Sequence, residues 1–170
     1  MLEWLESCDS TSRIVKDRIR KGLKAPLAVA AAMQTAGVGR MGKSWISAPG
    51  NLHLSIALPP SMFTLQDVGQ ASLYAGVLTA EWLEKRFGVV GCVKWPNDIF
   101  VDGLKVAGIL CEASYVGQDF QGLIVGVGVN LHVAPKLVGD DGASYAAGAL
   151  VPQNLAQFNV QELANELAHY

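Results

Sequence analysis

The stretch that most constrains the fold is IFVDGLKVAGIL at residues 99–110, in which Asp102-Gly103 joins two β-rich runs. Asp-Gly in this position is typical of a type I′ hairpin turn, because both turn residues need positive φ. The sequence therefore predicts two antiparallel strands around this turn. The expected cross-strand pairs are Val101 with Leu104, Phe100 with Lys105, and Asp98 with Ala107.

This register places two charged side chains on one face of the hairpin. Asp98 ends the segment KWPND, and Lys105 follows the turn. As diagonal neighbours their backbones would lie roughly 7–8 Å apart, so the side chains could meet or hold a ligand between them. An exposed salt bridge that contributes little to stability is the alternative. Pro96 and Asn97 favour the binding interpretation, because they fix the turn that aims Asp98.

The remaining patterns indicate an α+β protein. Expected strands are 26–33, 51–60, 89–95 and 122–131, with a polar loop at 139–148. Expected helices are 10–21, capped by Ser10 or Thr11, then 65–87, which stops at Gly88, and one from Asn159 to Tyr170. Because the strands are mostly sequential, we expect a mixed or antiparallel sheet with helices packed on it.

Composition limits the class of protein. With 51% hydrophobic and 16% charged residues, the 170-residue chain is expected to form one compact domain, 1–170. A net charge of −2 gives no sign of a nucleic-acid surface, and no apolar run reaches the length of a membrane span. Cys8, Cys92 and Cys111 form no metal pattern, so we interpret them as small core residues of a cytoplasmic protein.

The loop GVGRMG at 37–42 fits the glycine pattern of dinucleotide sites, but its context does not. A strand-like run follows it instead of a helix, and no acidic residue stands about 20 positions later. Gly37, Gly39 and Gly42 could instead expose N–H groups to an anion beside Arg40 and Lys43, with Trp45 as a stacking surface. A surface loop with two incidental cations is the alternative.

Other polar residues carry weaker signals. Asn130, at the end of the strand LIVGVGVN, is a candidate ligand, although a lone asparagine there is more often a turn former. His53, His132 and His169 have no spacing typical of a metal site or a nucleophile triad, so no chemistry is assigned to them.

In combination, several motifs carry a family resemblance. QTAGVGRMGKSW, KWPNDI, KVAGIL followed by Glu112, and GVGVN, in this order and spacing, resemble the biotin protein ligases, and DSTS near the start fits the same family. The resemblance implies the class II aminoacyl-tRNA synthetase/biotin protein ligase-like fold. It also implies two half-reactions: biotin and ATP give biotinyl-5′-AMP, and a lysine of a carboxylase carrier domain then takes the biotin.

The resemblance further implies roles for individual residues. Arg40 and Lys105 would contact the biotin carboxylate and the α-phosphate, and Lys43 the pyrophosphate. Asp98 would orient the acceptor lysine and take its proton. Biotin would be held by Ser10, Thr11 and Gln34 and by a slot lined by Gly37, Gly108 and Leu110. Trp45 and Asn130 would hold the adenine. Gly39 would bind as part of the loop at 37–42. Magnesium is expected with ATP.

The sequence departs from the family pattern in places. The family loop is commonly GRGRxGR, so Val38 replaces an arginine and Lys43 another. Only a catalytic domain is expected, without the N-terminal DNA-binding domain or the C-terminal β-barrel of many relatives. We therefore expect no nucleic-acid or membrane partner, and a homodimer stays open. The alternatives are a lipoate or octanoyl transferase on the same fold, or a non-catalytic biotin-binding homologue.

Overall fold

The computed structural model describes residues 2–135, 146–150 and 158–170. They form a seven-stranded sheet in the order β1-β2-β5-β9-β8-β7-β6. Its strands are β1 (Leu2–Leu5), β2 (Leu27–Ala31), β5 (Leu52–Leu58), β6 (Cys92–Lys94), β7 (Asp98–Val101), β8 (Leu104–Val116) and β9 (Asp119–Val129). Only β1 and β2 run parallel; the other neighbours are antiparallel. The predicted mixed sheet is therefore confirmed.

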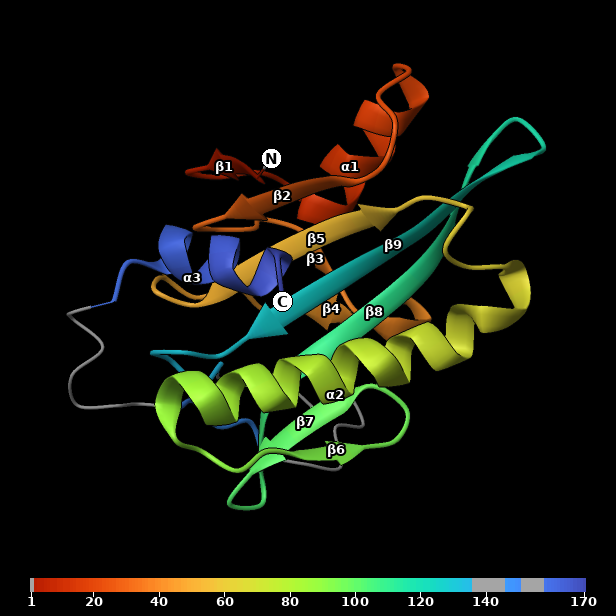
Figure 1. Ribbon diagram of the computed structural model, residues 1–170. Helices are drawn as coiled ribbons and strands as arrows, with labels where there is room; N and C mark the ends of the chain where they lie inside the picture. Colours follow the sequence, from red (N-terminus) through yellow and green to blue (C-terminus); the bar gives the residue numbers. More distant parts are fainter. Residues whose placement is uncertain (1, 136–145, 151–157) are drawn as a thin grey trace.

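Helices cover both faces of this sheet (Figure 1). α2 (Val68–Phe87) and α3 (Val160–Ala168) lie on one face, whereas α1 (Thr11–Arg20) lies on the other. A small hairpin of β3 (Gly37–Val38) and β4 (Ser44–Trp45), joined by the 3₁₀ turn η1 (Arg40–Gly42), lies on the same side as α1. α1 leaves part of this face open, and the site is built there.

The helix ends follow the predicted stop and cap signals. α2 follows a short 3₁₀ turn, η2 (Leu65–Asp67), and ends at Gly88, which has φ 70°. The side chain of Asn159 accepts hydrogen bonds from the N–H groups of Gln161 and Glu162, which caps α3. The α3 helix ends at Ala168, two residues before the predicted end.

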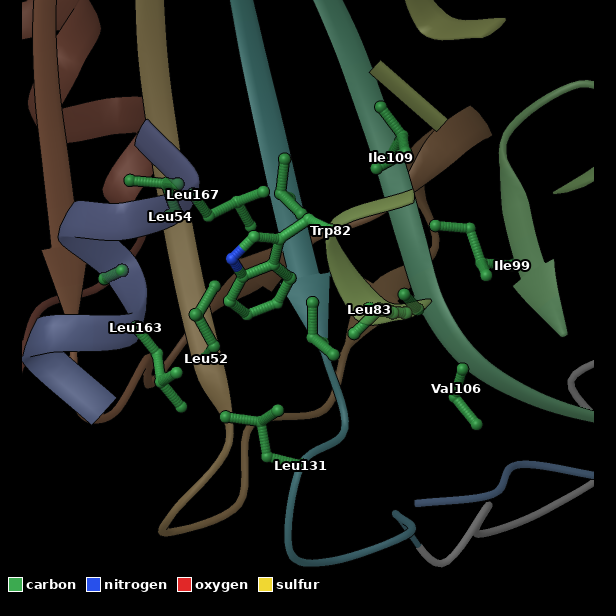
Figure 2. Packing of buried hydrophobic residues seen from close by; sticks show 14 of the residues in the cluster. Leu52, Leu54, Trp82, Leu83, Ile99, Val106, Ile109, Leu131, Leu163 and Leu167 are labelled. Atoms are coloured by element: carbon green, nitrogen blue, oxygen red, sulfur yellow. The ribbon is translucent and has the colours of Figure 1, made fainter. Parts of the chain in front are cut away.

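The main core lies between the sheet and the α2–α3 layer (Figure 2). Trp82 and Leu83 of α2 and Leu163 of α3 form one apolar cluster with Leu52 and Leu54 of β5 and with Ile109 of β8. On the opposite face, apolar packing is limited to the part that α1 covers. The rest of that face can therefore carry polar residues.

The predicted hairpin is present, but its register is wrong beyond two pairs. Asp102 and Gly103 have φ 51° and 78°, as a type I′ turn requires. A bulge between Ile99 and Phe100 then shifts the pairing, so that Asp98 lies opposite Gly108 and not Ala107. The sequence contains no signal for this extra residue, because a bulge depends on the neighbouring strands.

Several further expectations need correction. β1 and the β3–β4 pair were not predicted, because strands this short have too few residues to show a periodicity. Ser10 is the first residue before α1, but its side chain makes no capping hydrogen bond. Cys92 is exposed because β6 is an edge strand, so it is no core residue. The predicted loop 139–148 lies mostly outside the described residues.

No helix among the described residues combines the length and the apolar character that a membrane crossing requires.

Candidate active site

The open face of the sheet carries a row of small and polar residues. Cross-strand pairing aligns Asp98 with Gly108, Gly108 with Gly128, and Gly128 with His53. The indole of Trp45 lies directly on the two glycines. A Cβ atom at Gly128 would be 2.4 Å from ring atoms Cε2 and Cζ2, and one at Gly108 would be 3.0 Å from Cζ3. Only glycine at both positions lets this ring lie on the strands.

A cluster of hydroxyl and amide groups occupies the neighbouring part of the face. Thr11 donates from N–H and Oγ1 to Gln34 Oε1, at 2.8 and 3.1 Å. The Ser55 hydroxyl lies 2.7 Å from Thr11 Oγ1 and 3.1 Å from Ser12 Oγ. Ser10 is buried beside them. This end of the site can exchange hydrogen bonds with a neutral polar ligand.

Asp98 and Lys105 form the ion pair that the shared face of the hairpin predicted. The distance from Asp98 Oδ1 to Lys105 Nζ is 2.7 Å, and the side chains keep 20% and 30% exposure. Lys105 Nζ also lies 5.9 Å from the centre of the Trp45 ring. Asp98 Oδ1 is buried and has no hydrogen-bond partner among the described residues besides this ion pair. The ammonium group is therefore close to both the carboxylate and the indole.

The glycine loop is bent differently from the prediction. Positive φ occurs at Met41 and Gly42, and Gly39 is extended. The Gly39 N–H donates to Lys43 O at 2.7 Å, so it is already used within the loop. Gly37 is needed for close packing, since a Cβ there would lie 2.5 Å from Trp45 O. A backbone anion nest at Gly39 is therefore not what this structure contains.

The cationic side chains of the loop point to the rest of the site. Arg40 Nη1 donates to Asn97 Oδ1 at 3.5 Å, which brings the loop next to the KWPND turn. The arginines of α1 are different, because they are paired with acidic side chains: Arg18 with Glu3 at 2.5 Å and Arg20 with Asp17 at 3.5 Å. Those cations on α1 are thus a paired helix surface.

These groups surround one cavity of about 580 Å³. All predicted site residues except Gly37 line it: Ser10, Thr11, Gln34, Gly39, Arg40, Lys43, Trp45, Asp98, Lys105, Gly108, Leu110 and Asn130. Val38, the departure from the family loop, also lines it. The sequence motifs therefore meet in one place, although they come from five segments of the chain.

Asn130 lines the cavity but is also buried and hydrogen-bonded within the protein. It is 2% exposed, its Nδ2 donates to Gly148 O at 3.0 Å, and its Oδ1 accepts from Asn51 Nδ2 at 3.4 Å. Its role as an adenine ligand stays a prediction.

Sequence reasoning missed several residues of the site, although some signals were available. Ser12, Ser55, Gly126 and Gly128 line the cavity. Ser55 alternates with leucines in NLHLSIAL, which places it on the face opposite the core. Alternating glycines in GVGVN indicate close approach of another group. That this group is Trp45 follows only from the tertiary structure.

Burial controls the titration of groups near the site. His53 is 2% exposed, and its pKa lies below the ordinary value because burial disfavours the charged imidazolium. Its Nδ1 lies 3.2 Å from Ala31 O, whereas Nε2 has no partner among the described residues. Burial likewise raises the pKa of the Cys111 thiol to about 11. The raised pKa keeps Cys111 as the thiol near pH 7, so it is not poised as a thiolate nucleophile.

The site does not offer a dedicated magnesium cage. Among the described residues no three His, Cys, Asp or Glu side chains gather in one place. Asp98 is the one acidic residue in the described lining, and it is paired with Lys105. Mg²⁺ prefers carboxylates together with substrate phosphates. These residues therefore fit magnesium only as a companion of a nucleotide, and no step is assigned to it.

Comparison with known proteins identifies the family. A sequence model described as the Biotin/lipoate A/B protein ligase family matches residues 4–130. The chain belongs to this family. Among curated relatives of the biotin/lipoate ligase family, the bifunctional ligase/repressor BirA of Bacillus subtilis is 38% identical over 109 residues, which cover 64% of this chain and 33% of that protein. The biotin–[acetyl-CoA-carboxylase] ligase of Paracoccus denitrificans is 36% identical over 79% of this chain and 55% of that protein.

Solved structures of the same family share the fold. The biotin protein ligase from Aquifex aeolicus in complex with biotin and ATP has a TM-score of 0.77 and 29% identity, covering 99% of this chain and 67% of its own. The Leishmania major ligase in complex with biotinyl-5-AMP has a TM-score of 0.78 and 25% identity, covering 98% and 71%. The predicted biotin protein ligase-like fold is confirmed. The chain spans about a third of the length of the first curated relatives it matches.

Proposed function

We propose that this chain is the catalytic domain of an ATP-dependent biotin protein ligase. One observation carries the proposal: a single cavity joins a hydroxyl and amide cluster, an Asp98–Lys105 pair with two further cations, and a tryptophan face. Such a cavity suits a ligand with a neutral polar ring, an anionic centre and an aromatic base. Biotin joined to AMP has these three parts in this order.

In the first half-reaction, a carboxylate oxygen of biotin attacks the α-phosphorus of ATP. The bond from that phosphorus to the β-phosphate oxygen breaks, and pyrophosphate leaves with its electron pair. The two reactants are both anions, so their repulsion opposes the approach. Arg40 and Lys105 offset it with fixed positive charge that remains in place in the transition state. Lys43 lies on the same loop and suits the leaving pyrophosphate.

The two ends of the ligand find different surroundings. The ureido ring of biotin has both N–H donors and a carbonyl acceptor, which suits the Thr11, Gln34 and Ser55 cluster. The adenine would stack on the Trp45 face that points away from Gly128. Holding both ends fixes the reacting atoms near Lys105, and such positioning accounts for much of the rate in bimolecular reactions.

The Asp98–Lys105 pair suits the second half-reaction. When Lys105 turns to the phosphate, the Asp98 carboxylate loses its partner and can accept a proton from the incoming lysine ammonium. The neutral amine then attacks the carbonyl carbon of the anhydride, the C–O bond to the phosphate breaks, and AMP leaves with its electron pair while the new amide nitrogen loses its extra proton to solvent. We propose a lysine on the carrier domain of a biotin-dependent carboxylase as this acceptor, in line with the name of the Paracoccus relative.

The test is incubation with ATP, Mg²⁺, labelled biotin and a purified carrier domain. The proposal expects label on the carrier lysine and none when that lysine is replaced by arginine. Parallel reactions with lipoate and octanoate address the other substrates of this family. Transfer of lipoate or octanoate but not biotin would replace the proposal by the transferase alternative, and biotin binding without transfer would favour a non-catalytic homologue.

A further inference from the structure

Asn51 carries a densely hydrogen-bonded side chain next to the site: it does not line the cavity itself, but it contacts Asn130, which does. Its Oδ1 accepts from the N–H groups of His132 at 3.0 Å and Val133 at 3.1 Å. Its Nδ2 donates to Val133 O at 2.8 Å and to Asn130 Oδ1 at 3.4 Å. The residue is 1% exposed. All four hydrogen-bonding positions of one buried carboxamide are thus used.

The network continues from Asn51 to the backbone of the central lysine. Asn130 Nδ2 donates to Gly148 O at 3.0 Å, and Leu150 N–H donates to Asn130 O at 3.0 Å. The Gly148 N–H in turn donates to Lys105 O at 2.9 Å, and the Lys105 N–H donates to Ala146 O at 3.1 Å. Segment 146–150 is therefore held between Asn130 and Lys105.

We infer that Asn51 is a positioning residue that fixes the nucleotide end of the site and the strand carrying Lys105. This inference rests on the proposed ligase function. Asn51 sets the orientation of the Asn130 carboxamide: Asn51 Nδ2 donates to Asn130 Oδ1, so Asn130 Nδ2 is directed to Gly148 O. If an acceptor replaced the Asn51 amide NH2 group, it would face Asn130 Oδ1, another acceptor. The Asn130 carboxamide would then favour rotation, and Gly148 O would lose its donor.

Asn51→Asp tests this directly, because it keeps the shape and both accepted hydrogen bonds but removes both donors. In buried surroundings an unmatched acceptor is costly, so the 146–150 segment should loosen. We expect faster amide hydrogen exchange at Gly148 and Leu150 by NMR. We also expect adenylate formation to lose roughly 5- to 100-fold in kcat, the equivalent of one lost buried hydrogen bond, with the KM for biotin unchanged. Asn51→Ser, which is smaller and leaves space for a water, serves if the aspartate variant does not fold.

Asn159→Ala is the matched control. It removes a cap on α3 that takes no part in the Asn51–Asn130–Gly148 hydrogen bonds, and should lower the Tm without changing exchange at Gly148 or kcat. Unchanged exchange at Gly148 and Leu150 in Asn51→Asp would overturn the inference, and so would a kcat per folded molecule equal to that of the parent chain. The proposed function fails on a different result, namely a parent chain that forms no adenylate, and the exchange data then still decide whether Asn51 holds this segment.

Discussion

Replacing Gly128 by alanine would put a methyl group where the Trp45 indole now lies. The added Cβ would be 2.4 Å from two ring carbons, whereas carbon atoms in contact prefer about 3.5–4 Å. The ring must therefore move by about 1 Å or more, away from the sheet and into the space that we assign to adenine. Overpacking of this kind costs about 1–3 kcal/mol, which corresponds to about a 5- to 150-fold change in an equilibrium constant.

The assay is the ATP dependence of biotin-stimulated pyrophosphate release. We expect the KM for ATP to rise in that range in Gly128→Ala, with a smaller rise in Gly108→Ala, where the contact would be 3.0 Å. Gly126→Ala is the control on the same strand and face, since its Cβ would come no closer than 3.3 Å to Ser12 Oγ, 3.5 Å to Leu110 O and 3.7 Å to Ser55 Oγ. In the Trp45→Leu background, Gly128→Ala should raise the KM for ATP less than it does in the parent chain. Equal effects at Gly126 and Gly128, or strictly additive effects with Trp45→Leu, would show that contact with the Trp45 ring is not the cause.

Three further predictions concern charge and titration. Lys105→Ala should reduce adenylate formation by on the order of 100-fold or more, and far more than Lys43→Ala, because we propose that Lys105 contacts the reacting groups; equal losses in a single-turnover assay would contradict this role. Val38→Arg should slow the release of biotinyl-5′-AMP, measured by filter binding, because it adds a cation to the cavity lining; an unchanged release rate would count against it. The unfolding free energy should fall as the pH drops below about 6.5, since the unfolded chain then protonates His53 while the folded chain, with its lowered pKa, does not. His53→Gln should flatten this part of the curve, and an unaltered slope in urea titrations would show that other groups cause it.

Local patterns predicted much of the fold because its main elements carry local signals. Asp102-Gly103 specifies its own turn, and Gly88 ends α2 through a left-handed conformation that glycine adopts without strain. The bulge that moves Asp98 opposite Gly108 has no such local cause. It depends on how β8 pairs with two neighbours at once, which a single strand sequence does not encode.

The same distinction between local and long-range causes applies to the site residues. Lys105 and Asp98 share a strand pair, so alternation alone brings them together, and the motif residues around the loop carry the family pattern. Asn51 and Gly128 act through partners more than 75 positions away, respectively Asn130 and Trp45. Their importance is visible only when the sheet brings these segments side by side.

The most direct test of the central claim is isotope exchange between labelled pyrophosphate and ATP in the absence of any acceptor protein. Reversal of adenylate formation moves the label into ATP, so we predict exchange that requires biotin and is lost in Lys105→Ala. Exchange that occurs equally without biotin, or none at all from a folded chain that binds both biotin and ATP, would contradict the claim that this cavity joins the two.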